Sequence, residues 1–135
     1  MKLNNDEHYS IPLPEQGSED CQTVSSVIAR IGDKWSLQII VLLGSGTKRF
    51  NEIKRTVNGV SQRMLTLTLR GLERDGLVNR TIFPTVPPRV DYELTELGKS
   101  LWLVIEPLGE WAISHVNEIK LARKQFDSHN ADLNH

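Results

Sequence analysis

The sequence predicts a mainly α-helical fold with one small β-hairpin, and three observations support this prediction. Apolar residues recur at helical spacing over much of the chain, as they do between Val24 and Ile31. A short helical segment, a turn at residues 58–59 and a longer helical segment follow one another in the order of a helix-turn-helix. Two β-rich segments then flank a proline-rich tip, which predicts a winged helix-turn-helix with the hairpin as its wing.

The N-terminal part of the chain is expected to form an arm and three helices. Residues 1–20 are polar and acidic, and we expect a flexible arm there. An amphipathic helix is predicted over residues 21–31, and a second helix over residues 34–43 is apolar on most sides, which indicates burial. A very short strand at residues 48–50 is expected to lead into a third helix over residues 51–57.

The next segment is predicted to form the second helix of the helix-turn-helix and the wing. Ser61 is the expected N-cap of this helix, which Gly76 ends. Residues 78–83 are rich in β-branched and aromatic side chains, and alternating apolar residues predict a partner strand over residues 90–94. Since proline cannot donate a ladder hydrogen bond, the tip between the strands, with Arg89, is expected to protrude.

The C-terminal region carries a long apolar stripe between residues 97 and 119, and Pro107 is expected to kink the helix or divide it in two. Such a stripe exceeds what one small domain can bury, so we expect it to pack against a second copy; folding back on its own core is the alternative. Residues 126–135 are polar and predict a disordered tail, which leaves residues 21–125 as one domain. The predicted dimer interface, through the terminal helices, comprises Val24, Val27, Leu101, Val104, Leu108, Trp111 and His115.

The composition argues against several classes of protein. The apolar runs are too short to span a bilayer and no secretory signal is visible, so no membrane partner and a cytoplasmic location are expected. Cys21 is the only cysteine, so an intrachain disulfide cannot form. The histidines lack metal-ligand spacing, and there is no phosphate-binding loop or catalytic cluster. We therefore expect no metal, no cofactor and no enzymatic activity.

The charge distribution favours binding to double-stranded DNA. The net charge is −1, but residues 48–89 hold nine basic and three acidic residues, a local net charge of +6 between acidic flanks. A basic centre with acidic flanks is typical of a DNA-binding surface with a separate dimerisation region. An ordinary solvated surface is the alternative interpretation of this block.

Helical geometry indicates which side chains would face the DNA. If the leucines of the fourth helix face the core, the opposite face presents polar and basic residues, and its N-terminal part would enter the major groove. Gln62 suits adenine, Arg63 suits guanine and Leu67 suits a thymine methyl group. Arg89 would enter a narrow minor groove, or alternatively pair with Asp91. The predicted DNA-binding residues are Ser61, Gln62, Arg63, Thr66, Leu67, Arg70, Lys48, Arg49 and Arg89.

Several motifs resemble those of the HxlR family of winged-helix regulators, which is related to the MarR group. Besides Cys21, they are residues 31–35 (IGDKW), 49–53 (RFNEI), 59–66 (GVSQRMLT), 72–78 (LERDGLV) and 87–95 (PPRVDYELT). The resemblance covers about residues 21–112. It implies a homodimer that binds a two-fold symmetric operator and regulates bacterial genes, with a small-molecule effector as a candidate partner. Leu67 departs from the family, which usually carries a polar residue there.

Cys21 has two interpretations. A lone cysteine is most often a small buried apolar residue. At the start of a helix its thiolate is stabilised, although Glu19 and Asp20 oppose that charge. In parts of the HxlR family a cysteine at this position senses thiol-reactive or oxidising compounds, so the resemblance implies a redox-sensing role.

A different class of function is also compatible with this fold. A winged helix can lose DNA binding and act as a protein-interaction module through its apolar helices. The basic residues of the fourth helix and of the wing favour the DNA-binding interpretation over this alternative.

Overall fold

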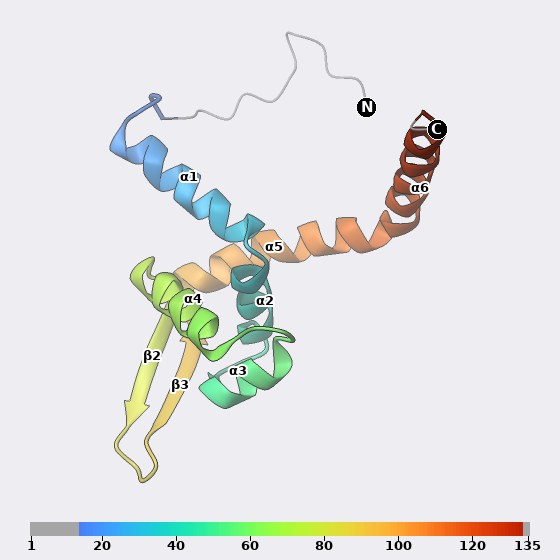
Figure 1. Ribbon diagram of the computed structural model, residues 1–135. Helices are drawn as coiled ribbons and strands as arrows, with labels where there is room; N and C mark the ends of the chain where they lie inside the picture. Colours follow the sequence, from blue (N-terminus) through green and yellow to red (C-terminus); the bar gives the residue numbers. More distant parts are fainter. Residues whose placement is uncertain (1–13, 134–135) are drawn as a thin grey trace. The chain divides into compact units, whose positions relative to one another are not determined.

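The computed structural model describes residues 14–133 and contains six α-helices and three strands within that range (Figure 1). It divides into two compact units, residues 1–33 and residues 34–135. This division falls inside the single domain predicted over residues 21–125, because the backbone turns from helical to extended at Asp33, which separates the first helix from the second.

The first unit contains α1 (Glu19–Gly32), which begins earlier than expected. The Ser18 hydroxyl accepts a hydrogen bond from the backbone N–H of Cys21 at 3.1 Å, so Ser18 caps the helix. Glu19 and Asp20 form the first turn, where acidic side chains are favourable beside the helix dipole. The predicted flexible arm therefore ends before Glu19, and residues 1–13 of that prediction lie outside the described residues.

The second unit is built around α2 (Lys34–Leu43), α3 (Phe50–Thr56) and α4 (Gln62–Arg74). The apolar α2 lies at the centre of the unit, as its sequence predicts, and Gly59 makes the turn between α3 and α4 with a φ of 88°. Because a left-handed backbone favours glycine, the turn can be this tight. Most of the fully buried apolar residues come from these three helices and their connections: Ile39, Ile40, Ile53, Val57, Leu65, Leu69 and Leu72.

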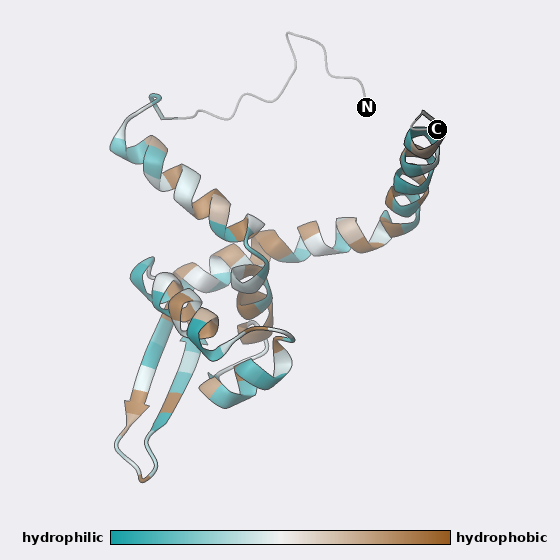
Figure 2. Cartoon of the chain, in the orientation of Figure 1, coloured by the Kyte–Doolittle hydropathy of each residue, from teal (hydrophilic) through white to brown (hydrophobic). Residues whose placement is uncertain are grey.

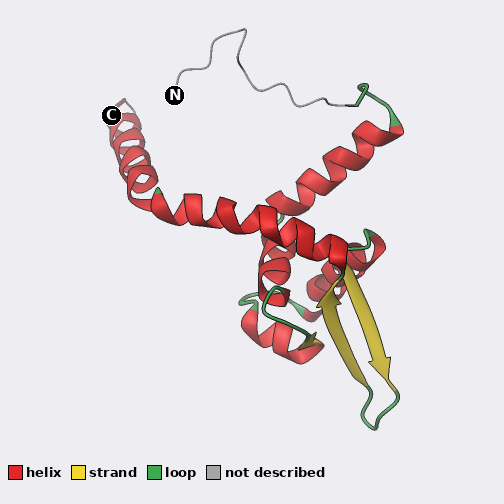
Figure 3. Cartoon of the chain, turned by 180° about the vertical axis from the view of Figure 1, so that it is seen from behind, coloured by secondary structure: helices red, strands yellow, loops and turns green. Residues whose placement is uncertain are grey.

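A three-stranded antiparallel sheet in the order β1-β3-β2 packs beside these helices. It consists of β1 (Lys48–Arg49), β2 (Val78–Phe83) and β3 (Arg89–Leu94), and the β2–β3 hairpin extends beyond the helices of this unit (Figure 3). The fold class is therefore confirmed as mainly helical with a small hairpin wing. The prediction that Arg89 lies in the protruding tip is wrong, because Arg89 pairs with Phe83 in the ladder; the tip consists of residues 84–88.

The C-terminal region forms two helices, but they divide at His115 and not at Pro107. α5 (Glu96–Ser114) passes through Pro107, which is exposed, so water can replace the backbone hydrogen bond that proline removes. α6 (Val116–Leu133) follows, so the disordered tail predicted from residue 126 is wrong up to residue 133. This segment lacks proline and glycine, and polar residues do not by themselves prevent a helix. None of the helices within residues 14–133 is long and apolar enough to cross a membrane.

Candidate nucleic-acid interface

The N-terminal half of α4 presents an exposed polar face. Ser61 caps the helix, since its hydroxyl oxygen accepts the backbone N–H of Met64 at 3.0 Å. The next positions alternate between buried residues that hold the helix on the core and exposed residues on the opposite side. The buried residues are Leu65, Thr68, Leu69 and Leu72, and the exposed ones include the predicted base contacts Gln62, Arg63, Thr66 and Leu67.

Arg63 is the exposed cation nearest the start of α4. Its side chain is exposed, and it makes no ion pair with any residue that the structure describes. Thr66 is more constrained, because its hydroxyl donates to the carbonyl of Gln62 at 2.9 Å. Leu67 is 56% exposed, so its side chain is accessible for an apolar contact.

Arg70 lies one turn further along α4 and is held by Glu73. Arg70 Nη1 lies 3.1 Å from Glu73 Oε1, and the other oxygen, Oε2, lies 3.3 Å from Arg80 Nε on β2. Glu73 and Arg80 are not among the predicted site residues. The i, i+3 spacing of Arg70 and Glu73 is a sequence signal for their ion pair. The ion pair of Glu73 and Arg80 has no such signal, because it depends on how β2 packs. Burial raises the pKa of Tyr92, the ladder partner of Arg80.

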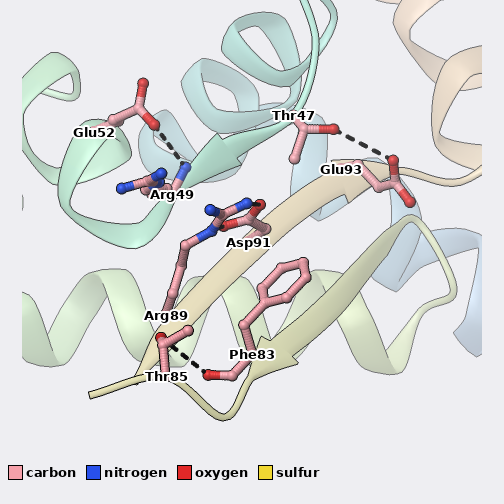
Figure 4. Close-up of polar contacts among 8 residues, drawn as sticks. All are labelled: Thr47, Arg49, Glu52, Phe83, Thr85, Arg89, Asp91 and Glu93. Atoms are coloured by element: carbon pink, nitrogen blue, oxygen red, sulfur yellow. Dashed lines mark hydrogen bonds and ion pairs between the residues drawn. The ribbon is translucent and has the colours of Figure 1, made fainter. Parts of the chain in front are cut away.

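Arg89 is paired with Asp91, the alternative that the sequence left open (Figure 4). The guanidinium binds the carboxylate through two hydrogen bonds of 3.0 Å and lies 4.5 Å from the centre of the Phe83 ring. The hydrogen bonds from Arg89 lower the pKa of Asp91, and the same pairing raises the pKa of Arg89. The contact fixes Arg89 on the face of the hairpin.

A cleft of about 750 Å³ lies between α3 and the wing. Arg49, Arg55 and Arg89 reach it from β1, α3 and β3, so the fold gathers three cations that are far apart in the sequence. Glu52 also lines it and accepts the backbone N–H of Arg49 at 3.1 Å (Figure 4). Lys48, the other predicted contact of β1, is half-buried. The cleft can therefore hold a phosphate group, although Glu52 offsets part of its charge.

The predicted dimer residues of α5 fall into two groups. Leu101 is partly buried against the core, because it shares a helix face with Ile105. Leu101 therefore belongs mainly to the core. The others are more exposed: Val104 is 63% exposed, Leu108 48% and Trp111 55%. Hydrophobic positions recur along α5 (Figure 2). His115 is half-buried and stacks on the Trp111 indole, with ring centres 4.6 Å apart.

The predicted residues of α1 lie in the first unit. Val24 is 38% exposed and Val27 is half-buried. Cys21 is half-buried in the first turn of the helix, where its backbone N–H donates a hydrogen bond to the Ser18 hydroxyl. Within residues 14–133, no three or more His, Cys, Asp or Glu side chains are grouped so that they could hold a metal ion.

The arrangement of α3, the turn at Gly59, the capped α4 and the β2–β3 hairpin defines a winged helix-turn-helix protein. The model of the HxlR-like helix-turn-helix family matches residues 30–120, and the chain belongs to this family. The resemblance seen in the sequence motifs is thus confirmed.

Individual relatives agree with this assignment. The HTH-type transcriptional regulator YtcD of Bacillus subtilis is 41% identical over 97 residues, which are 72% of this chain and 77% of YtcD. The solved structure of the transcriptional regulator ytfH from Salmonella typhimurium matches with a TM-score of 0.73 and 34% identity, over 82% of this chain and 97% of that chain. The solved structure of the redox regulator HypR in its reduced form matches with a TM-score of 0.68 and 40% identity, over 73% of this chain and 97% of that chain.

Proposed function

We propose that this protein is a transcription regulator that binds a two-fold symmetric DNA operator as a homodimer. The observation that carries the proposal is the exposed N-terminal half of α4, where the exposed Arg63 lies beside the capped helix end. The N-terminal part of a recognition helix enters the major groove most deeply. YtcD and ytfH, which are similar to this chain, are both named as transcriptional regulators.

The exposed residues suit distinct roles in such a complex. Gln62, Arg63, Thr66 and Leu67 would contact bases, since amide and guanidinium groups bind base edges and an apolar group contacts the thymine methyl. Phosphates would be bound by the helix end at Ser61 and by basic side chains of β1 and α4. The basic residues are Lys48, Arg49 and Arg70, and Arg89 would reach the minor groove after exchanging Asp91 for DNA.

The exposed apolar side of α5 is the proposed dimerisation surface. Val104, Leu108 and Trp111 recur at helical spacing, and each leaves about half or more of its surface in water in the single chain. An apolar row of this length is typical of an interface between subunits. His115 extends this surface in the second unit, and Val24 and Val27 of α1 are separately proposed as dimer contacts of the first unit. A dimer would present two α4 helices to two operator half-sites.

We further propose that Cys21 makes the regulator responsive to thiol-reactive or oxidising compounds. The solved structure of a relative with 40% identity is named as a redox regulator. Cys21 is only half-buried, and as the sole cysteine it would react by an intersubunit disulfide, a mixed disulfide or an adduct. A non-covalent small-molecule effector is the other candidate for the signal.

Selection from a library of DNA duplexes with a randomised core tests the proposal. We expect the wild-type protein to enrich a two-fold symmetric sequence and to bind it with an affinity that falls steeply with salt. The Arg63→Ala variant should bind the enriched duplex about 10-fold or more weakly and lose most of its preference over a shuffled duplex. Arg123→Ala removes the same side chain from α6 and should bind like the wild type.

The outcomes of this selection separate the two classes of function. If the wild-type protein retains no duplex at low salt, the DNA-binding function is wrong and the winged-helix interaction module takes its place. If it retains duplexes but enriches no sequence, the sequence-specific role of α4 is wrong.

A further inference from the structure

We propose that Glu73 increases the preference of the protein for its operator over random DNA. Its carboxylate restrains Arg70 and Arg80, and this restraint weakens binding to random DNA more than binding to the operator. This inference rests on the proposed DNA-binding function and assigns a role within it to a residue outside the predicted contacts. It makes Glu73 a positioning residue, because the carboxylate acts through the two guanidinium groups that it holds.

The geometry places Glu73 between two elements of the proposed DNA-binding surface. One carboxylate oxygen lies 3.1 Å from Arg70 Nη1 on α4, and the other lies 3.3 Å from Arg80 Nε on β2. The Arg70 and Arg80 side chains remain 53% and 32% exposed. Each guanidinium carries five N–H donors, so each keeps donors for a phosphate while it contacts Glu73.

Stability alone is a poor explanation for an acidic residue at this position. Glu73 lies in the last turn of α4, where the helix dipole favours a cation, and Arg74 next to it follows that preference. Its two ion pairs are partly exposed, and exposed ion pairs contribute little to stability. A carboxylate on this side of the helix also repels DNA phosphates, so its effect on binding is large compared with its effect on folding.

The restraint acts differently on the two kinds of DNA. Binding to random DNA depends on the number of cations that are free to meet phosphates, and Glu73 neutralises one of the two charges that Arg70 and Arg80 bring. In the operator complex, base contacts of α4 would hold the DNA backbone in one register, and each arginine keeps donors that do not contact Glu73 for a phosphate of that backbone. The carboxylate then keeps the guanidinium groups in place for that phosphate.

The test compares Glu73→Gln with the wild type on two probes, the duplex enriched by selection and a shuffled duplex of the same composition. We expect the variant to bind the shuffled duplex about 3-fold to 10-fold more tightly at low salt, with a log–log salt dependence steeper by about one unit. Affinity for the enriched duplex should change by less than about 2-fold, so the specificity ratio falls.

A matched control separates this local effect from a change of net charge. Glu96 pairs with Lys99 at the same i, i+3 spacing and the same distance of 3.1 Å, but on α5. Glu96→Gln should leave both affinities and the salt dependence unchanged. In an Arg80→Ala background, Glu73→Gln should raise the affinity for shuffled DNA less than it does alone, because only Arg70 is then released.

Each outcome supports or overturns one statement. If the wild type binds duplexes and Glu73→Gln matches Glu96→Gln on both probes and at all salt concentrations, the role of Glu73 is wrong while the DNA-binding function stands. If Glu73→Gln weakens both probes equally, Glu73 acts only as a structural support, which also overturns the inference. If the wild type binds no duplex, the DNA-binding function itself fails.

Discussion

Gly98, in the first turn of α5, lies directly against the backbone carbonyl of Leu77, just before β2. A Cβ atom at residue 98 would overlap the Leu77 oxygen, which also accepts the backbone N–H of Thr95 at 3.1 Å. Thr95 in turn caps α5, because its hydroxyl accepts the N–H of Gly98 at 3.0 Å. This close approach joins the wing to the C-terminal helices, and only glycine leaves room for it.

Replacing Gly98 by alanine should therefore destabilise the protein by about 2 kcal/mol, as overpacking of a fixed backbone does. Chemical denaturation at constant protein concentration measures the change in the free energy of unfolding. Gly109→Ala is the control in the same helix, since its Cβ would meet open space, and it should be as stable as the wild type or slightly more stable. Equal stability of the two variants would contradict the close packing at Gly98.

Replacing Leu108 by glutamate should convert the proposed dimer to a monomer. Leu108 is 48% exposed in the single chain, so the substitution spares the core, but it would bury an unpaired charge in the interface. Sedimentation velocity gives the mass in solution. Ile82→Glu, on the exposed side of β2, changes an equally apolar and exposed residue outside the proposed interface and should leave the mass unchanged. A wild-type monomer would disprove the dimer, and a dimeric Leu108→Glu variant would disprove this interface.

Oxidation with diamide should change the DNA affinity of the wild type by about 10-fold or more, within the usual range of allosteric coupling, and leave Cys21→Ser unaffected. The Cys21→Ser variant should not respond because Cys21 is the only thiol in the chain. In the wild type, every disulfide must therefore join Cys21 to another molecule. Mass spectrometry and non-reducing electrophoresis identify the product, and reduction should restore the original affinity. If the oxidised wild type binds DNA as before, the sensing role of Cys21 is wrong.

The pair of Arg89 and Asp91 should make stability depend on acid pH. Since Arg89 lowers the pKa of Asp91 in the folded protein, the ionised carboxylate favours folding, and its contribution is present above the ordinary value of 3.8. The free energy of unfolding of wild type and Asp91→Asn, measured from about pH 7 to pH 2.5, should differ at neutral pH. The difference should vanish as the pH falls through the lowered pKa. A difference that does not change with pH would contradict this account, and Asp127→Asn on α6 is the control.

The sequence predicted most of the regular elements because their signals are local. The spans of α2 and β2 agree with the structure, and Ser61 is a cap as expected. Apolar spacing at 3.6 or 2 residues depends only on which face an element buries, so it can be recognised before the fold is known. Hydroxyl side chains followed by helical residues are similarly local.

The errors at the ends of the elements have physical reasons that a local pattern does not contain. Pro107 does not break α5, because it lies on an exposed side where solvent can satisfy the freed carbonyl group. The polar residues after residue 126 continue α6, since polarity alone does not oppose a helix. The position of Arg89 depends on its register with Phe83 across the hairpin, and not on its nearness to the prolines in the sequence.

The sequence by itself determined the fold class, the capped α4 with its exposed basic face, and the membership in a family of winged helix-turn-helix proteins. Only the tertiary structure decided which charges pair. Glu73 meets Arg80 because β2 packs beside the end of α4, and three arginines share one cleft because β1, α3 and β3 converge there. Electrostatic contacts depend on distances of a few ångströms between elements, and such distances are set by packing and not by the spacing of residues along the chain.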